Sequence, residues 1–174
     1  HEEEDLASMS LSLEEQGRAA REFVVGLLRE MGMEAEVTVR TLDESTAEVS
    51  VQGDGLGILV GPGGATLAAL QEVTRTVLQK HTGGHSDRIL VDVAGYRAKR
   101  AEALQRFTRQ VAEEVLASGS ERALEPMSAS DRKVVHDTVN DLVGVQTRSE
   151  GEDPRRFIVI SPAAEGQPED TDGG

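Results

Sequence analysis

The sequence predicts an α+β protein built from two small modules. Segments in which apolar residues recur at helical spacing are interspersed with short segments in which apolar and polar residues alternate, as they do in half-buried strands. Glycine clusters separate many of these segments, which marks them as turns. The length of 174 residues allows two small domains with modest cores.

The first module is predicted to begin with a helix and a hairpin. Ser12 and Glu15 form a capping-box pair, and the apolar residues that follow recur at helical spacing over residues 13–31. Polarity then alternates over residues 34–40 and 47–52. This alternation predicts two strands of a hairpin with one wet, acidic face.

The rest of the first module is predicted to be a short helix, a longer helix and a third strand. A short apolar segment over residues 56–60 precedes the turn Gly61-Pro62-Gly63-Gly64. The next helix has these inward positions: Leu67, Leu70, Thr74, Val77 and Leu78. Gly83-Gly84 closes that helix, and residues 88–93 form the strand.

A long helix from residue 96 to 118 is predicted to join the two modules. Its expected buried positions are Leu104, Phe107, Val111 and Val115. The second module is then predicted to contain a short strand near residues 122–125, a helix over 130–142, and strands near 144–149 and 155–160.

The formal charge of −14 is concentrated at the two ends of the chain. Residues 1–54 hold 4 basic and 14 acidic residues, and residues 161–174 hold 4 acidic residues and no basic residue. Residues 55–160 carry 14 of each sign, so the middle of the chain can present local basic patches. The acidic, small-residue segments 1–11 and 162–174 predict disordered tails.

The turn Gly61-Pro62-Gly63-Gly64 is the first candidate site. Small residues there let a phosphate backbone approach a helix N-terminus, whose N–H groups lack intrahelical partners. A lone Gly-x-x-Gly is more often a plain tight turn. In a KH domain, however, such a loop clamps the backbone of about four nucleotides. An adjacent groove holds the splayed bases, and the element order given above is the type II arrangement of that fold.

Residues 57–71, with the sequence GILVGPGGATLAALQ, resemble the Jag proteins, also called SpoIIIJ-associated proteins. Residues 91–100 resemble the family's strand-to-helix junction, and residues 124–127 resemble the entry to its C-terminal domain. The resemblance covers residues 12–161. It implies RNA binding, often a small KH-only protein as a partner, and a link to cell-division or envelope control. The expected KH loop lacks the basic residue that is usual in the family, and the extra N-terminal Jag domain of many members is expected to be absent.

Arg132 and His136 form the second candidate site. They lie four residues apart on a predicted helix and so share one face, where an Arg fork and a neutral ring suit phosphate contact and base stacking. Two such residues alone are more often a solvated Arg and a surface His. Residues 125–127 and 145–156, on either side of this helix, resemble the Arg-x-x-x-His domain of Jag proteins. That domain is named for this pair and is associated with single-stranded nucleic acid.

Four further cations are predicted to extend a basic surface around this pair: Lys133, Arg148, Arg155 and Arg156. They rank below Arg132 and His136, because charged residues at strand ends are most often only solvated. Thr147 and Ser149 offer neutral hydrogen bonds to phosphate.

Enzyme signatures are missing from the sequence. The glycines near residue 55 do not fit the dinucleotide fingerprint, and neither a phosphate-binding P-loop nor a His-Glu-x-x-His zinc motif occurs. His81 and His85 have no acidic pair nearby to complete a metal site, and the lack of cysteine removes thiolate sites and disulfides. We therefore expect no catalysis, no metal or other cofactor, and no small-molecule substrate.

The sequence as a whole predicts a cytoplasmic protein that binds single-stranded RNA. No apolar run approaches the roughly 18 residues that cross a bilayer, so no membrane insertion is expected. The predicted organisation is a tail over 1–11, a type II KH domain over 12–94, a linker helix over 95–119, an Arg-x-x-x-His domain over 120–161 and a tail over 162–174. The alternative is a protein-protein adaptor whose KH fold has lost strong RNA binding.

Overall fold

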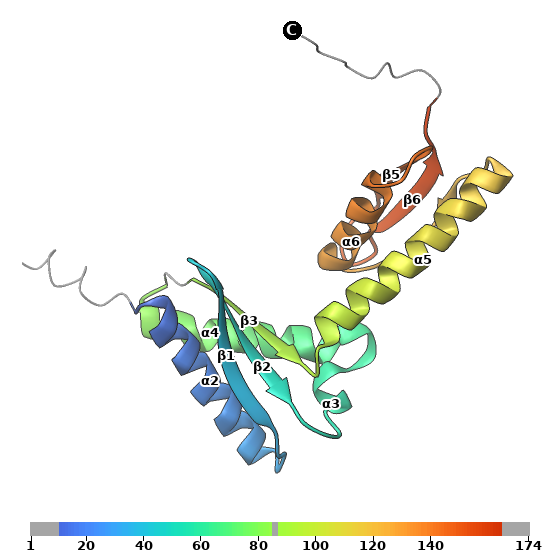
Figure 1. Ribbon diagram of the computed structural model, residues 1–174. Coiled ribbons are helices and arrows are strands. Elements are labelled where there is room, and N and C mark those ends of the chain that lie inside the picture. Colours follow the sequence, from blue (N-terminus) through green and yellow to red (C-terminus); the bar gives the residue numbers. More distant parts are fainter. Residues whose placement is uncertain (1–10, 85–86, 165–174) are drawn as a thin grey trace, which may run out of the picture. The chain divides into compact units, whose positions relative to one another are not determined.

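The computed structural model describes residues 11–84 and 87–164 (Figure 1). The chain divides into two compact units, His1–Arg97 and Ala98–Gly174. Each unit is treated by itself below. The predicted disorder of residues 1–10 and 165–174 lies outside the described residues.

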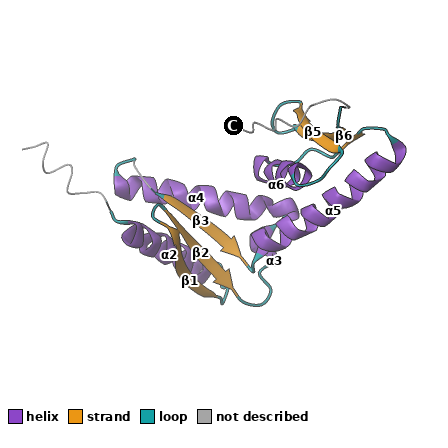
Figure 2. Cartoon of the chain, turned by 45° about the horizontal axis from the view of Figure 1, so that its top comes forward, coloured by secondary structure: helices purple, strands orange, loops and turns teal. Residues whose placement is uncertain are grey.

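The first unit is a three-stranded sheet with helices packed on it (Figure 2). Its elements are α2 (Leu13–Glu30), β1 (Glu36–Asp43), β2 (Thr46–Gln52), α3 (Gly57–Val60), a 3-10 turn (Pro62–Gly64), α4 (Ala65–Thr82) and β3 (Arg88–Val93). The sheet order is β1-β2-β3, with β1 and β2 antiparallel and β2 and β3 parallel. The predicted α+β class is confirmed, and the elements follow the predicted order.

Local signals explain where the helices of the first unit begin and end. The Ser12 hydroxyl accepts a hydrogen bond from the Glu15 amide at 3.2 Å, and the Glu15 carboxylate accepts one from the Ser12 amide at 2.8 Å. Gly83 ends α4 with φ of 69°, a conformation that favours glycine. The core beneath the sheet is formed mainly by aliphatic residues of α2, α4 and the three strands.

The second unit is a smaller antiparallel sheet covered by helices. It contains most of α5 (Tyr96–Ser118), then β4 (Arg122–Ala123), α6 (Ala129–Asn140), β5 (Val145–Glu150) and β6 (Phe157–Pro162). The sheet order is β4-β6-β5. The core joins α5, α6 and the sheet through Val111, Val115, Val135, Ile158 and Ile160. Most of the helix that we expected to join the modules thus packs within the second unit.

One predicted core residue of α5 is wrong. Phe107 is 43% exposed, whereas its neighbour Thr108 is fully buried. The buried stripe runs through Leu104, Thr108, Val111 and Val115, and Phe107 lies one position, or about 100°, around the helix from Thr108. The other three predicted positions, Leu104, Val111 and Val115, are buried, so only the position of Phe107 is wrong. Among the described residues, no helix is both long and apolar enough to cross a membrane.

Candidate nucleic-acid interface

The turn between α3 and α4 requires glycine at its two outer positions. Gly61 has φ of 70°, and a Cβ atom there would lie 2.2 Å from Thr66 Oγ1. Gly64 has φ of 80°, and its Cβ would lie 2.8 Å from a ring carbon of Tyr96. Any side chain at either position would therefore clash or strain the backbone.

The two middle residues of this turn are exposed. Gly63 faces open space, but its φ of 61° would strain most side chains. Pro62 begins the 3-10 turn and can be replaced without that strain. Neither residue carries a positive charge, so any attraction of this turn for phosphate must come from the backbone.

The N-terminus of α4 lies at this turn and has no competing side chain. Gly64 supplies no side-chain cap, and the first turn of α4 contains no acidic residue. The first N–H groups of a helix lack intrahelical partners and carry the positive end of the helix dipole. The turn therefore places an exposed, sterically open backbone beside a site that favours an anion.

A groove of about 580 Å³ lies between α4 and β3 in the same unit. Its lining includes Gln71, Arg75, Arg88, Leu90 and Arg97. Arg97 donates two hydrogen bonds to the Val91 carbonyl oxygen, at 3.0 and 3.2 Å. A base-holding groove was expected from the KH comparison, but the residues that line this groove come from two separated segments and were not named as site residues from the sequence.

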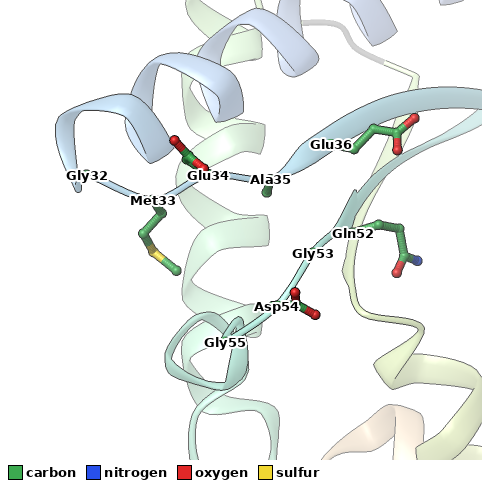
Figure 3. Close-up of a pocket in the computed structure, with 9 residues that line it drawn as sticks. All are labelled: Gly32, Met33, Glu34, Ala35, Glu36, Gln52, Gly53, Asp54 and Gly55. Atoms are coloured by element: carbon green, nitrogen blue, oxygen red, sulfur yellow. The ribbon is translucent and has the colours of Figure 1, made fainter.

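A large cavity of the first unit is acidic (Figure 3). It measures about 810 Å³ and lies where β1 begins and β2 ends. Glu34, Glu36 and Asp54 contribute carboxylates, and none of the residues that line it is basic. Phosphate would be repelled there, so cavity size does not identify the nucleic-acid surface.

In the second unit, Arg132 is buried and takes part in two hydrogen bonds. Its Nη1 atom donates to the Met127 carbonyl oxygen at 2.7 Å and to Asp153 Oδ1 at 3.0 Å. The Arg132 side chain is only 10% exposed. It therefore ties the segment before α6 to the loop between β5 and β6.

His136 faces β5 and contacts two hydroxyl groups. Its Nδ1 atom lies 2.6 Å from Thr147 Oγ1, and its Nε2 atom lies 3.1 Å from Ser149 Oγ. A neutral ring donates from one nitrogen and accepts at the other, and a hydroxyl can serve either role. The predicted hydroxyl pair and the predicted histidine thus form one connected group.

Lys133 and Arg148 are ion-paired on the surface. Lys133 lies 2.6 Å from the Asp137 carboxylate, one helical turn away. Arg148 lies 2.9 Å from Glu121 and 2.8 Å from Glu150. The hydrogen bond from Arg148 lowers the pKa of Glu121, and both carboxylates raise the pKa of Arg148.

One of the two Arg148 pairs crosses the middle strand of the second sheet. In the sheet register Arg148 of β5 and Ala123 of β4 both stand opposite Val159 of β6. Glu121 directly precedes β4, so the Arg148–Glu121 pair spans β6. Val159, on this outer face, is only 3% exposed.

Arg155 and Arg156 differ from the other predicted cations. Both are exposed on the loop between β5 and β6, and within the described part of the chain neither makes an ion pair. This loop also carries Asp153, the partner of Arg132. Of the ten predicted site residues, four lie on the first unit and six on the second.

A comparison of the sequence with known protein families assigns this part of the chain to a class of domain. The family model of the Arg-x-x-x-His (RxxxH) domain matches residues 102–162. This range contains nearly all of the second unit's described elements, including the Arg132 and His136 pair. The second unit is therefore an Arg-x-x-x-His domain.

Curated relatives extend the match to the first unit. The RNA-binding protein KhpB of Bacillus subtilis (strain 168) is 34% identical over 129 residues, which are 73% of this chain and 61% of the relative. The protein of the same name from Clostridium symbiosum is 32% identical, over 82% of this chain and 64% of the relative. That from Lactiplantibacillus plantarum is 30% identical, over 90% of this chain and 48% of the relative.

These matches define the family. The chain belongs to the Jag family, together with the proteins named KhpB, and the predicted resemblance is confirmed. The chain spans about half to two thirds of the length of these relatives.

Proposed function

We propose that the chain is a single-stranded RNA-binding regulatory protein without catalytic activity, in which both units contact the same RNA strand. The observation that carries this proposal is the exposed glycine turn at the N-terminus of α4, which has no side-chain cap, on the same helix whose later residues line the groove with β3. The names of the relatives, RNA-binding protein KhpB, support the same function.

The first unit is proposed to be a type II KH domain. Its order of helix, strand, strand, short helix, helix and strand supports this assignment, as does the position of the glycine turn between the last two helices. In this proposal Gly61, Pro62, Gly63 and Gly64 hold the RNA backbone. The groove between α4 and β3 then receives bases.

In the second unit, Arg155 and Arg156 are proposed to make the main phosphate contacts, since both are exposed and unpaired within the described residues. Arg132 acts as a positioning residue, because its bonds to Met127 and Asp153 hold the loop that carries these two arginines. His136 contacts RNA by stacking or hydrogen bonding.

Lys133 and Arg148 are also proposed to contact phosphate. To do so, each must release a carboxylate partner and bind a phosphate oxygen in its place. The cost of this exchange is small, because exposed ion pairs contribute at most about 1 kcal/mol.

The wider biological role rests on the family resemblance. We propose a cytoplasmic location, a small KH-only protein as a partner, and a role in cell-division or envelope control. The second candidate function is a protein-protein adaptor. It is favoured by one observation: the exposed residues Pro62 and Gly63 supply no cation to hold phosphate.

Fluorescence anisotropy with labelled single-stranded RNA tests the proposal. The double substitution Pro62→Asp with Gly63→Asp places two negative charges on the turn, and Asp tolerates the backbone at residue 63 better than most residues. Affinity is expected to fall sharply, because phosphate is repelled. Pro62→Ser with Gly63→Asn is the matched neutral control and should bind much more tightly than the Asp pair.

Thermal unfolding of both double variants checks that the turn still folds. Equal RNA affinity of the charged and neutral pairs, at equal stability, would remove the turn from the RNA site. A parent chain that binds no single-stranded RNA would favour the adaptor.

A further inference from the structure

The edge of β3 that faces the groove is covered by a side-chain amide. Gln71 of α4 donates from Nε2 to the Ile89 carbonyl oxygen at 2.5 Å. Its Oε1 atom accepts from the Val91 amide at 2.6 Å and from Arg97 Nη2 at 3.3 Å. The three bonds agree on one orientation of the amide, with its oxygen toward N–H donors and its nitrogen toward a carbonyl.

These bonds use backbone groups that the sheet leaves open. Arg88 and Ala94 donate their backbone N–H groups to Ser45 and Val51, so the even-numbered residues of β3 face β2. Ile89 and Val91 therefore direct their N–H and C=O groups away from the sheet, toward the groove. Gln71 occupies the place that the backbone of a fourth strand would take.

A nucleobase offers the same kind of hydrogen-bonding edge as a side-chain amide. An unstacked base presents a donor beside an acceptor, for example the amino group and the adjacent ring nitrogen of adenine or cytosine. The edge of β3 offers the complementary pair, the Ile89 carbonyl oxygen and the Val91 amide. In the free chain Gln71 already satisfies both groups.

We infer that Gln71 is an internal competitor for a base-recognition site on the edge of β3, and that it limits how strongly this unit reads RNA sequence. This inference rests on the proposed RNA binding in the same groove. A base reaches the Ile89 and Val91 groups only when Gln71 leaves them. Its apparent affinity is therefore reduced by the fraction of molecules in which the edge is free.

Arg97 strengthens this competition. Its guanidinium group donates to the Val91 carbonyl oxygen and to Gln71 Oε1 at once, so it holds the amide against the strand. While Gln71 covers the backbone edge of β3, the arginines that line the groove and the apolar Leu90 side chain remain accessible to RNA. Sugar-phosphate contacts and stacking need no hydrogen bond to the strand, so the parent chain is expected to bind many sequences similarly.

The test compares intact RNA with RNA that lacks one base. A labelled strand of about eight nucleotides, twice the length that a KH loop clamps, is made with an abasic sugar at each position in turn. Binding of the full chain to each strand is measured by fluorescence anisotropy. The abasic penalty is the ratio of the dissociation constants of abasic and intact RNA, and it measures how much a base contributes.

Gln71→Ala is expected to raise the abasic penalty at one position to about tenfold, since two hydrogen bonds of ordinary strength become available to the base. In the parent chain the penalty at that position is expected to be several times smaller. Gln71→Asn is a second variant, because its amide is one carbon too short to reach both groups. Gln79→Ala is the matched control, since Gln79 is the same residue type on the same helix and also lines the groove.

Each outcome decides between the claims. A raised penalty in both Gln71 variants, with a parent-like penalty in Gln79→Ala, supports the competition. Equal penalties in the parent and both Gln71 variants overturn it while leaving RNA binding intact. Equal rises in the Gln71 variants and in Gln79→Ala also overturn it, since any loss of groove volume would then suffice. A parent chain that binds none of the strands overturns both the inference and the proposed function.

Discussion

Replacing Arg132 with Ala is expected to act mainly by destabilising the second unit, and not by removing a direct contact with RNA. The substitution removes the charged donor from the Met127 carbonyl oxygen, which lies 2.7 Å away. Hydrogen bonds to charged groups contribute about 1.5–3 kcal/mol. The ion pair with Asp153 adds little, because that carboxylate is 70% exposed.

These magnitudes translate into a measurable shift of the melting temperature. For a domain of 60–100 residues, 1 kcal/mol shifts the melting temperature by roughly 4–8 °C. A loss of about 2 kcal/mol from the Met127 bond therefore lowers the melting temperature of the second unit by roughly 8–16 °C. Circular dichroism and calorimetry on the full chain measure this shift.

Two control variants separate the hydrogen bond from the charges. Asp153→Asn keeps an oxygen acceptor for Arg132 and removes only the exposed carboxylate, so its cost is expected to stay below about 1 kcal/mol. Arg155→Ala removes an exposed cation on the same loop and should leave the melting temperature unchanged. If the Arg132→Ala variant has the same melting temperature as the parent chain, the reasoning from the Met127 bond is refuted. Arg132 would then be free to bind RNA directly.

Three further predictions concern charge. Pro62→Lys is expected to add one phosphate contact and to steepen the slope of log affinity against log salt by about 0.7, measured by anisotropy; an unchanged slope would argue against phosphate at the turn. Replacing both Arg155 and Arg156 with Ala should flatten that slope by about 0.7 for each phosphate that the chain no longer binds, and a parent-like slope would exclude them from the RNA surface. Glu121→Gln should destabilise the chain in urea at neutral pH. Because Arg148 lowers the pKa of Glu121 below its usual 4.5, the carboxylate stabilises the fold above that pH and loses this effect as the pH falls through the lower folded value. The difference from the parent should therefore vanish in acid, and a difference that persists there would contradict the pair.

The fold was predictable wherever local chemistry decides the structure. The Ser12 capping box and the Gly83 cap mark helix ends by interactions between residues close in sequence. The alternation predicted for the first hairpin holds in β2, but in β1, an edge strand, only Val37 is buried and Val39 is 37% exposed. Phe107 was misplaced because the choice between two adjacent helix positions depends on the packing partner, which the sequence does not show.

The roles of the candidate site residues were harder to predict, because they depend on contacts between distant segments. Arg132 and Arg148 look like free cations in the sequence, yet their partners Asp153 and Glu121 lie 21 and 27 residues away. Gln71 belongs to no motif of charge or metal binding. Its role appears only when α4 packs beside β3 and brings the amide to the strand edge.

If the proposed function holds, the paired cations bear on how selectively this acidic chain binds RNA. A phosphate that approaches Arg148 or Lys133 must displace a carboxylate that already holds it, so the net gain is smaller than for a free cation. Non-specific binding comes almost entirely from such phosphate contacts. The pairing of Lys133 and Arg148 with carboxylates therefore weakens non-specific binding most. RNA that also fits the glycine turn gains contacts with a turn that carries no carboxylate, and its advantage over other RNA increases.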